Sequence, residues 1–205
     1  MLNFTIALIL YYALHSLLAA TAVRQQIIRF GLPAPYYRVV YNLIAVTLLL
    51  PLAYCYTQAD QTLLISFEEP NTSFTFYLTK VAALSMMLLG SILLWRALSS
   101  YSLSEFSGRQ QLLQQQTAAV QTLNTNGLNA WIRHPLYLAV LIILTGVWLF
   151  SPSDLLLSVW IVTAVYVFVG ATLEERKLID EFGEAYRDYQ QRVPMIFPYR
   201  RPQKS

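Results

Sequence analysis

The sequence predicts an all-α integral membrane bundle of five transmembrane helices, followed by a C-terminal amphipathic helix. Of the 205 residues, 56% are hydrophobic and only 12% are charged, whereas soluble domains carry about 25% charged residues. Apolar stretches close to the roughly 20 residues that cross a bilayer recur along almost the whole chain. Basic residues also gather in alternate connections between these stretches. Together these observations indicate a membrane protein.

Five apolar stretches are expected to be transmembrane helices. They cover approximately residues 2–20, 39–56, 76–98, 136–150 and 155–173. The fourth stretch is short, because its fifteen residues extend about 22 Å in a hydrocarbon core about 30 Å thick. Its basic end, Arg133 and His134, should therefore lie below the headgroups, where charge is costly unless it lines a polar cavity. A tight turn at 151–153 should join the last two helices, and Pro152 and Asp154 mark where the fifth begins.

The distribution of charge predicts how the chain crosses the membrane. Thirteen of the fourteen basic residues lie in alternate connections and the tail: Arg24, Arg29, Arg38, Arg96, Arg109, Arg133, Arg176, Lys177, Arg187, Arg192, Arg200, Arg201 and Lys204. The other connections hold acidic residues, and Lys80 is the exception. The positive-inside rule therefore predicts an outside N-terminus and a cytoplasmic C-terminus. A bacterial inner (cytoplasmic) membrane is the expected location.

Composition also excludes several classes of function. A single cysteine excludes a disulfide scaffold and a zinc site made only of cysteines. The sequence has no Ser/His/Asp signature, glycine-rich phosphate loop or two-metal cluster, so no metal site is expected. A net charge of +3 is too small to indicate a nucleic-acid partner, and no obligate protein partner is inferred. The glutamine-rich segment 99–132 is a surface helix or an ordered loop, so residues 1–205 should form one domain.

The region after the fifth stretch resembles a surface helix. Five apolar residues recur there at helical spacing among charged ones: Leu178, Ile179, Phe182, Tyr186 and Tyr189. This pattern is typical of an amphipathic helix on a membrane surface. We therefore expect the chemistry on the cytoplasmic side.

Two charged clusters are candidates for that chemistry. Arg133 and His134 precede Pro135, a residue suited to the first helical position, where free N–H groups attract an anion. The alternative is a basic anchor with a helix-starting proline. Glu174 and Glu175 follow the fifth stretch, and the alternative is a helix that simply continues with solvated charges. Together the two clusters can bind a zwitterion such as S-adenosylmethionine, whose methyl transfer needs neither a metal nor a covalent intermediate.

These residues resemble the integral-membrane methyltransferase superfamily that includes isoprenylcysteine carboxyl methyltransferase and phospholipid methyltransferases. The resemblance rests on segments 126–128, 132–137, 173–178 and 182–183, with Tyr186, Tyr189, Val193 and Pro194. Other positions are closer to the methanethiol S-methyltransferase branch: Phe106, Gly108, Gln111, His15, Ser16, Tyr37, Arg38, Tyr41 and Asn42. Two positions depart from the family pattern, where Asn129 replaces an aromatic residue and Ala139 replaces a glycine.

The resemblance implies that S-adenosylmethionine binds within residues 106–198, while a lipophilic or small acceptor enters from the surrounding membrane lipids. The cofactor-binding residues it implies are Gln111, Gly127, Leu128, Arg133, His134, Tyr137, Glu174 and Glu175. The expected acceptor is a thiol, which is favoured, or an isoprenylcysteine-like carboxylate. Only a thiol needs a base or a cation that stabilises its thiolate, and the candidate catalytic residues for these roles are His134 and Arg192.

His15 supports a second interpretation. A histidine inside the first helix either hydrogen-bonds to a neighbouring helix or has a function. The sequence also resembles the nitric-oxide-reduction accessory proteins and zeta-carotene isomerase, which would imply haem ligation by His15 and His134. The glutamate pair and the tyrosine-containing tail favour the methyltransferase, and a non-enzymatic membrane protein is the third alternative.

Overall fold

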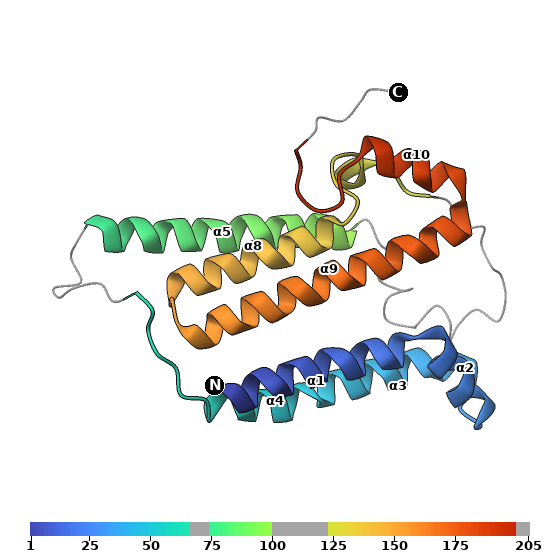
Figure 1. The fold of residues 1–205 in the computed structure, drawn as a ribbon, viewed down its shortest axis with the longest axis horizontal. Helices are drawn as coiled ribbons and strands as arrows, with labels where there is room; N and C mark the ends of the chain where they lie inside the picture. Colours follow the sequence, from blue (N-terminus) through green and yellow to red (C-terminus); the bar gives the residue numbers. More distant parts are fainter. Residues whose placement is uncertain (66–73, 100–122, 200–205) are drawn as a thin grey trace. The chain divides into compact units, whose positions relative to one another are not determined.

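The computed structural model describes residues 1–65, 74–99 and 123–199. Within these ranges the regular structure is helical, apart from an isolated bridge between Leu63 and Ser153 (Figure 1). Four helical stretches are long and apolar enough to cross a membrane: Leu2–Ala19, Ala34–Thr57, Phe74–Ser99 and Asp154–Phe182. The remaining expected span corresponds to the shorter apolar helix Pro135–Phe150. The chain is therefore an all-helical integral membrane protein.

The described residues divide into two compact units, of which the first is Met1–Thr62. It contains α1 (Leu2–Ala19), α2 (Thr21–Arg29), α3 (Ala34–Thr47) and α4 (Leu49–Thr57). The stretch predicted at 39–56 is thus two consecutive helices interrupted at Leu48. Proline lacks an N–H group, so Pro51 cannot donate to the carbonyl of Thr47, which explains the interruption. The short helix α2 was not predicted from the sequence.

Aromatic and hydrogen-bonding contacts hold the first unit together. The hydroxyl of Tyr41 on α3 lies 2.8 Å from Nε2 of His15 on α1. Tyr37 donates to the carbonyl of Leu18. This confirms the interpretation that His15 hydrogen-bonds to a neighbouring helix.

The second unit contains the described residues from Leu63 onward. Its helices are α5 (Phe74–Ser99), the 3₁₀ helix η1 (Gly127–Ala130), α8 (Pro135–Phe150), α9 (Asp154–Phe182) and α10 (Glu184–Arg192). The predicted tight turn at 151–153 is confirmed, and it makes α8 and α9 an antiparallel hairpin beside α5 (Figure 1). Ser153 caps α9 by accepting a hydrogen bond from the N–H of Leu156 (3.2 Å).

Small residues bring α5 and α8 into close contact. A Cβ atom added to Gly146 of α8 would lie 2.7 Å from the carbonyl oxygen of Ala83 on α5, and one added to Gly90 would lie 2.6 Å from Cγ1 of Ile143. Small residues allow this approach in membranes, where packing rather than the hydrophobic effect drives helix association. Ala139, which departs from the family pattern, is fully buried, and its carbonyl also faces Gly90.

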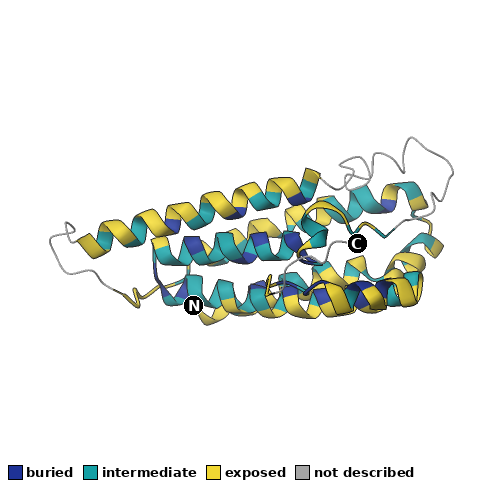
Figure 2. Cartoon of the chain, turned by 90° about the horizontal axis from the view of Figure 1, so that it is seen from above, coloured by how far each residue is buried: buried dark blue, intermediate teal, exposed yellow. Residues whose placement is uncertain are grey.

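Outside these contacts, the helices expose most of their apolar surface. Figure 2 shows exposed residues along much of each helix, and at most 22% of any of the four spanning windows is buried inside the protein. Leu50, Val81 and Leu88 are among the exposed apolar side chains. Such surface is suited to contact with lipid tails.

Where the sequence predicted a single C-terminal amphipathic helix, the structure has the end of α9 followed by a separate helix, α10. The spanning helix α9 continues past Leu173 to Phe182, and Gly183, with a φ of 57°, separates it from α10. Tyr186 and Tyr189 of α10 are buried, and they pack with Val193 against apolar side chains of α9 and of the segment before η1: Leu123, Leu178, Ile179 and Phe182. The apolar faces of α9 and α10 therefore cover each other.

Lys80, the exception to the charge pattern, has its charge stabilised by groups at the end of α8. Its ammonium group donates to the carbonyl of Phe150, at the C-terminal end of α8, and lies 4.3 Å from the centre of the Phe150 ring. A helix C-terminus and an aromatic face both attract a cation. The lysine therefore fits at this end without an acidic partner.

We expect Gly146→Ala to destabilise the protein by about 1–3 kcal/mol, because the new methyl group would collide with the backbone of α5. Gly170→Ala is the matched control, since a Cβ atom at this α9 glycine meets nothing within 4 Å. The control should be neutral or gain up to about 1 kcal/mol from helix propensity. Thermal unfolding in detergent measures both, and equal midpoints for the two variants would contradict the packing.

Candidate functional site

The predicted Arg133 and His134 lie between η1 and α8, where their backbone is held by the end of the chain. The N–H of Arg133 donates to the carbonyl of Pro194 (2.9 Å), and that of His134 donates to Met195 (3.0 Å). We call residues 193–196 the C-terminal strap. These two N–H groups therefore bind the strap rather than an anion.

The Arg133 side chain forms the centre of the site. Its Nε lies 2.6 Å from Oε1 of Glu175, and the two side chains are only 9% and 11% exposed. The guanidinium also donates to the carbonyls of Gln190 (3.0 Å) and Val193. A buried ion pair needs such additional hydrogen bonds to offset the loss of hydration. Arg133 thereby ties α9, α10 and the strap to the beginning of α8.

His134 lies between the two glutamates. Its Nε2 is 3.1 Å from Oε1 of Glu175, while its Nδ1 is 3.7 Å from Oε2 of Glu174. The ring stacks on Tyr137, with centroids 5.3 Å apart and planes at 8°. Because an ionised carboxylate only accepts, Nε2 carries the hydrogen in the neutral ring and Nδ1 carries the lone pair.

The two glutamates have different environments. Glu175 is buried, and its second oxygen accepts a hydrogen bond from Nε2 of Gln190 (2.8 Å). The Glu174 side chain is 47% exposed and accepts from the hydroxyl of Tyr137 (3.0 Å). Glu175 therefore belongs to the interior framework, whereas Glu174 faces outward from it.

Tyr186 completes the buried side of this cluster. Burial raises the pKa of its hydroxyl, and the nearby Glu175 carboxylate raises that pKa further. The hydroxyl stays protonated near neutral pH, so Tyr186 can donate a proton in a hydrogen bond but cannot serve as a base.

The other predicted site residues are placed differently. Gly127 and Leu128 lie in η1, which is attached to α10 by a hydrogen bond from the Tyr189 hydroxyl to the carbonyl of Asn129 (2.6 Å). Arg192 is exposed and donates to the backbone carbonyl of Asp188 on its own helix (3.2 Å), so it does not join the cluster. Gln111 lies outside the described residues, as do Phe106 and Gly108.

Gln190 is the residue that sequence reasoning missed. Its side chain binds Glu175 and its carbonyl binds Arg133. Gln190 lies among charged residues in α10, where the sequence pattern is that of an exposed residue, so no local signal identifies it as part of the site.

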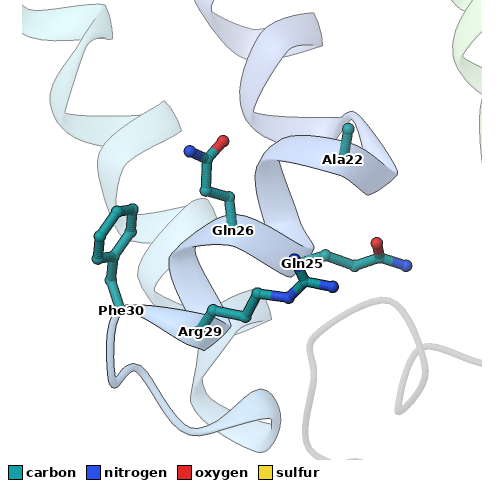
Figure 3. Close-up of a pocket in the computed structure, with 5 residues that line it drawn as sticks. All are labelled: Ala22, Gln25, Gln26, Arg29 and Phe30. Carbon is teal, nitrogen blue, oxygen red and sulfur yellow. The ribbon is translucent and has the colours of Figure 1, made fainter.

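A shallow depression lies on α2 in the first unit. It is lined by Ala22, Gln25, Gln26, Arg29 and Phe30 (Figure 3). None of these residues belongs to the charged cluster.

The fold and the cluster together define an integral membrane protein with a polar site built from helix ends. The family model described as "Protein of unknown function (DUF1295)" matches residues 34–193. The chain belongs to this family, which is of the isoprenylcysteine methyltransferase type.

Named relatives agree with this assignment. The chain is 45% identical over 74 residues to methanethiol S-methyltransferase 1 of Bradyrhizobium diazoefficiens, covering 36% of this chain and 25% of the relative. It is 39% identical over 74 residues to methanethiol S-methyltransferase of a Pseudomonas species, covering 36% and 28%. It is 33% identical over 94 residues to protein-S-isoprenylcysteine O-methyltransferase of Mus musculus, covering 45% and 33%.

The chain thus matches between about a quarter and a third of the length of these relatives. No solved structure matches it significantly. The names of these relatives imply a methyl donor, and they do not favour a haem protein.

We expect Arg133→Ala to destabilise the protein by about 3 kcal/mol, because it leaves the Glu175 charge buried without its cationic partner. Arg192→Ala removes the same side chain from an exposed position and should change stability by less than about 0.5 kcal/mol. Thermal unfolding in detergent compares the two variants. A midpoint for Arg133→Ala equal to that of Arg192→Ala would show that the ion pair does not hold the site together.

Proposed function

We propose that this protein is a membrane methyltransferase that uses S-adenosylmethionine and acts as one domain over residues 1–205. The observation that carries the proposal is the exposed carboxylate of Glu174, which is held by Tyr137 beside the buried His134 and the buried Arg133–Glu175 pair. Methyltransferase relatives support the reaction class. Bound S-adenosylmethionine would supply a methyl group on a positively charged sulfonium.

The proposed cofactor contacts come from Glu174 and from the buried residues that hold it in place. The exposed carboxylate of Glu174 suits the ammonium group or the ribose hydroxyls of the cofactor. Tyr137 fixes the direction of that carboxylate through its hydrogen bond. Arg133 and Glu175 act through each other as a frame, since both are nearly buried. Gln111, Gly127 and Leu128 are proposed to complete the cofactor region.

The proposed acceptor is a small or lipophilic thiol, with an isoprenylcysteine-like carboxylate as the second choice. A thiol must lose its proton for attack, whereas a carboxylate is already ionised near pH 7. Nδ1 of His134 is suited to receive that proton, because Nε2 faces Glu175 at 3.1 Å. Arg192 stays protonated and could only stabilise a thiolate as a cation, and its exposed position on α10 keeps it outside the cluster.

We further propose five spans in an inner membrane, with α8 as the short fourth span and the site at the cytoplasmic interface. The charge distribution supports an outside N-terminus and a cytoplasmic C-terminus. The α8 helix has 16 residues, or about 24 Å, so its start would lie below the headgroup level. Pairing of Arg133 inside the protein would make that depth tolerable.

We expect Glu174→Ala to weaken binding of S-adenosylhomocysteine about ten- to a hundredfold, because a charge-assisted contact contributes about 1.5–3 kcal/mol. Glu181→Ala is the control, since it removes an exposed carboxylate from the same helix. Isothermal titration in detergent measures both affinities. Equal affinity of Glu174→Ala and wild type would remove Glu174 from the site, and absence of binding by wild type up to millimolar ligand would favour a non-enzymatic protein.

The acceptor is tested by following methyl transfer from labelled S-adenosylmethionine with purified protein. Methanethiol, an N-acetyl-farnesylcysteine acid and phosphatidylethanolamine are offered side by side, and we expect turnover with methanethiol. His134→Gln should lower kcat for a thiol while sparing a carboxylate, because only the thiol needs a base. Turnover with the acid alone would overturn the thiol assignment.

A further inference from the structure

Helix α2 lies at the end of a membrane-spanning helix and carries unpaired positive charge. One extended residue, Ala20, separates it from α1. Arg24 and Arg29 lie on α2, and Arg38 lies at the start of α3, beside Tyr37, which contacts Leu18 at the end of α1. In residues 1–65 and the other described ranges, none of these three guanidinium groups has an ion pair or hydrogen bond.

Within Met1–Thr62, the described part of the first unit, the acidic side chain lies far from these arginines. The acidic residue in Met1–Thr62 is Asp60, which follows α4. Tyr56 near the end of α4 packs on Phe4 near the start of α1, with ring centroids 5.5 Å apart. Asp60 therefore lies near the opposite end of α1, whose 18 residues extend about 27 Å. That separation exceeds the Debye length of about 8 Å in physiological salt, so Asp60 does not balance the arginines of α2.

The depression on α2 is lined by groups that suit the headgroup of a phospholipid. Its depression has a volume of about 430 Å³ and combines the Arg29 guanidinium with the carboxamides of Gln25 and Gln26 (Figure 3). Phe30 borders it with a ring that is 84% exposed. A cation with hydrogen-bond donors suits a phosphate, while an exposed aromatic ring suits the boundary between headgroups and acyl chains.

We propose that the depression on α2, with Arg29, binds the headgroup phosphate of an anionic phospholipid, and that Phe30 contacts the acyl chains of that lipid. A lipid is favoured over a soluble anion because α2 directly follows a spanning helix and presents an apolar ring next to its cations. This site is independent of the proposed methyl transfer, because none of its residues belongs to the charged cluster of the second unit.

The test uses the full chain, purified and delipidated in detergent. Binding of short-chain phosphatidylglycerol, short-chain phosphatidylcholine and inorganic phosphate is titrated separately. We expect wild type to bind phosphatidylglycerol at least tenfold more tightly than either of the other ligands. Arg29→Gln should weaken that binding about fivefold, since one arginine near a phosphate contributes about that factor.

Two variants make the result specific. Arg187→Gln removes an exposed arginine of α10 and should leave phosphatidylglycerol affinity within twofold of wild type. Phe30→Ala should weaken binding of the lipid but not of inorganic phosphate. Arg29→Lys, which keeps the charge, guards against a folding defect and should bind the lipid better than Arg29→Gln. Equal affinity for the two lipids, equal loss in Arg29→Gln and Arg187→Gln, or phosphate bound as tightly as phosphatidylglycerol would each overturn the proposal.

Discussion

The buried ion pair between Arg133 and Glu175 is the interaction on which the site depends. Removing two charges from water is costly, and the cost is offset only when their remaining hydrogen-bonding groups are satisfied. Here the partners come from three places: His134 beside α8, Gln190 on α10 and the carbonyl of Val193 in the strap. The pair is therefore complete only when α8, α9, α10 and the strap are all in position. This requirement explains how a membrane protein can hold a defined polar site at its helix ends.

Packing within the bundle supplies the rigid base for that site. The α5 and α8 helices approach closely at glycine and alanine positions, and the short turn at 151–153 fixes α9 against α8. In a bilayer such close contact replaces the hydrophobic effect as the force between helices. In the N-terminal half of α8, away from the turn at 151–153, Leu141 is buried with Val167 of α9 and Ile196 of the strap. Apolar packing and the ion pair thus hold the strap at neighbouring points.

Adjacent residues of one type acquire different roles from their direction on a helix. Glu174 and Glu175 are about 100° apart around α9, so one faces outward and the other inward. Glu175 is buried in its ion pair with Arg133, while Glu174 keeps an exposed carboxylate next to Tyr137 and His134. The arginines show the same contrast, because Arg133 is satisfied inside the protein and Arg29 is exposed on α2. Charge type alone therefore does not distinguish a ligand contact from a structural one.

By itself, the sequence determined the positions of the four long apolar stretches, the turn between α8 and α9, and the two charged motifs. These features follow from local composition, from proline at a helix start and from the length of apolar runs. Only the tertiary structure decided that Arg133 binds the strap, that Gln190 joins the site, that α9 continues to Phe182, and that Ala139 packs against α5. The partners of Arg133 lie 42 to 60 residues away in the chain, and such distant pairs are fixed by the packing of helices rather than by any local pattern.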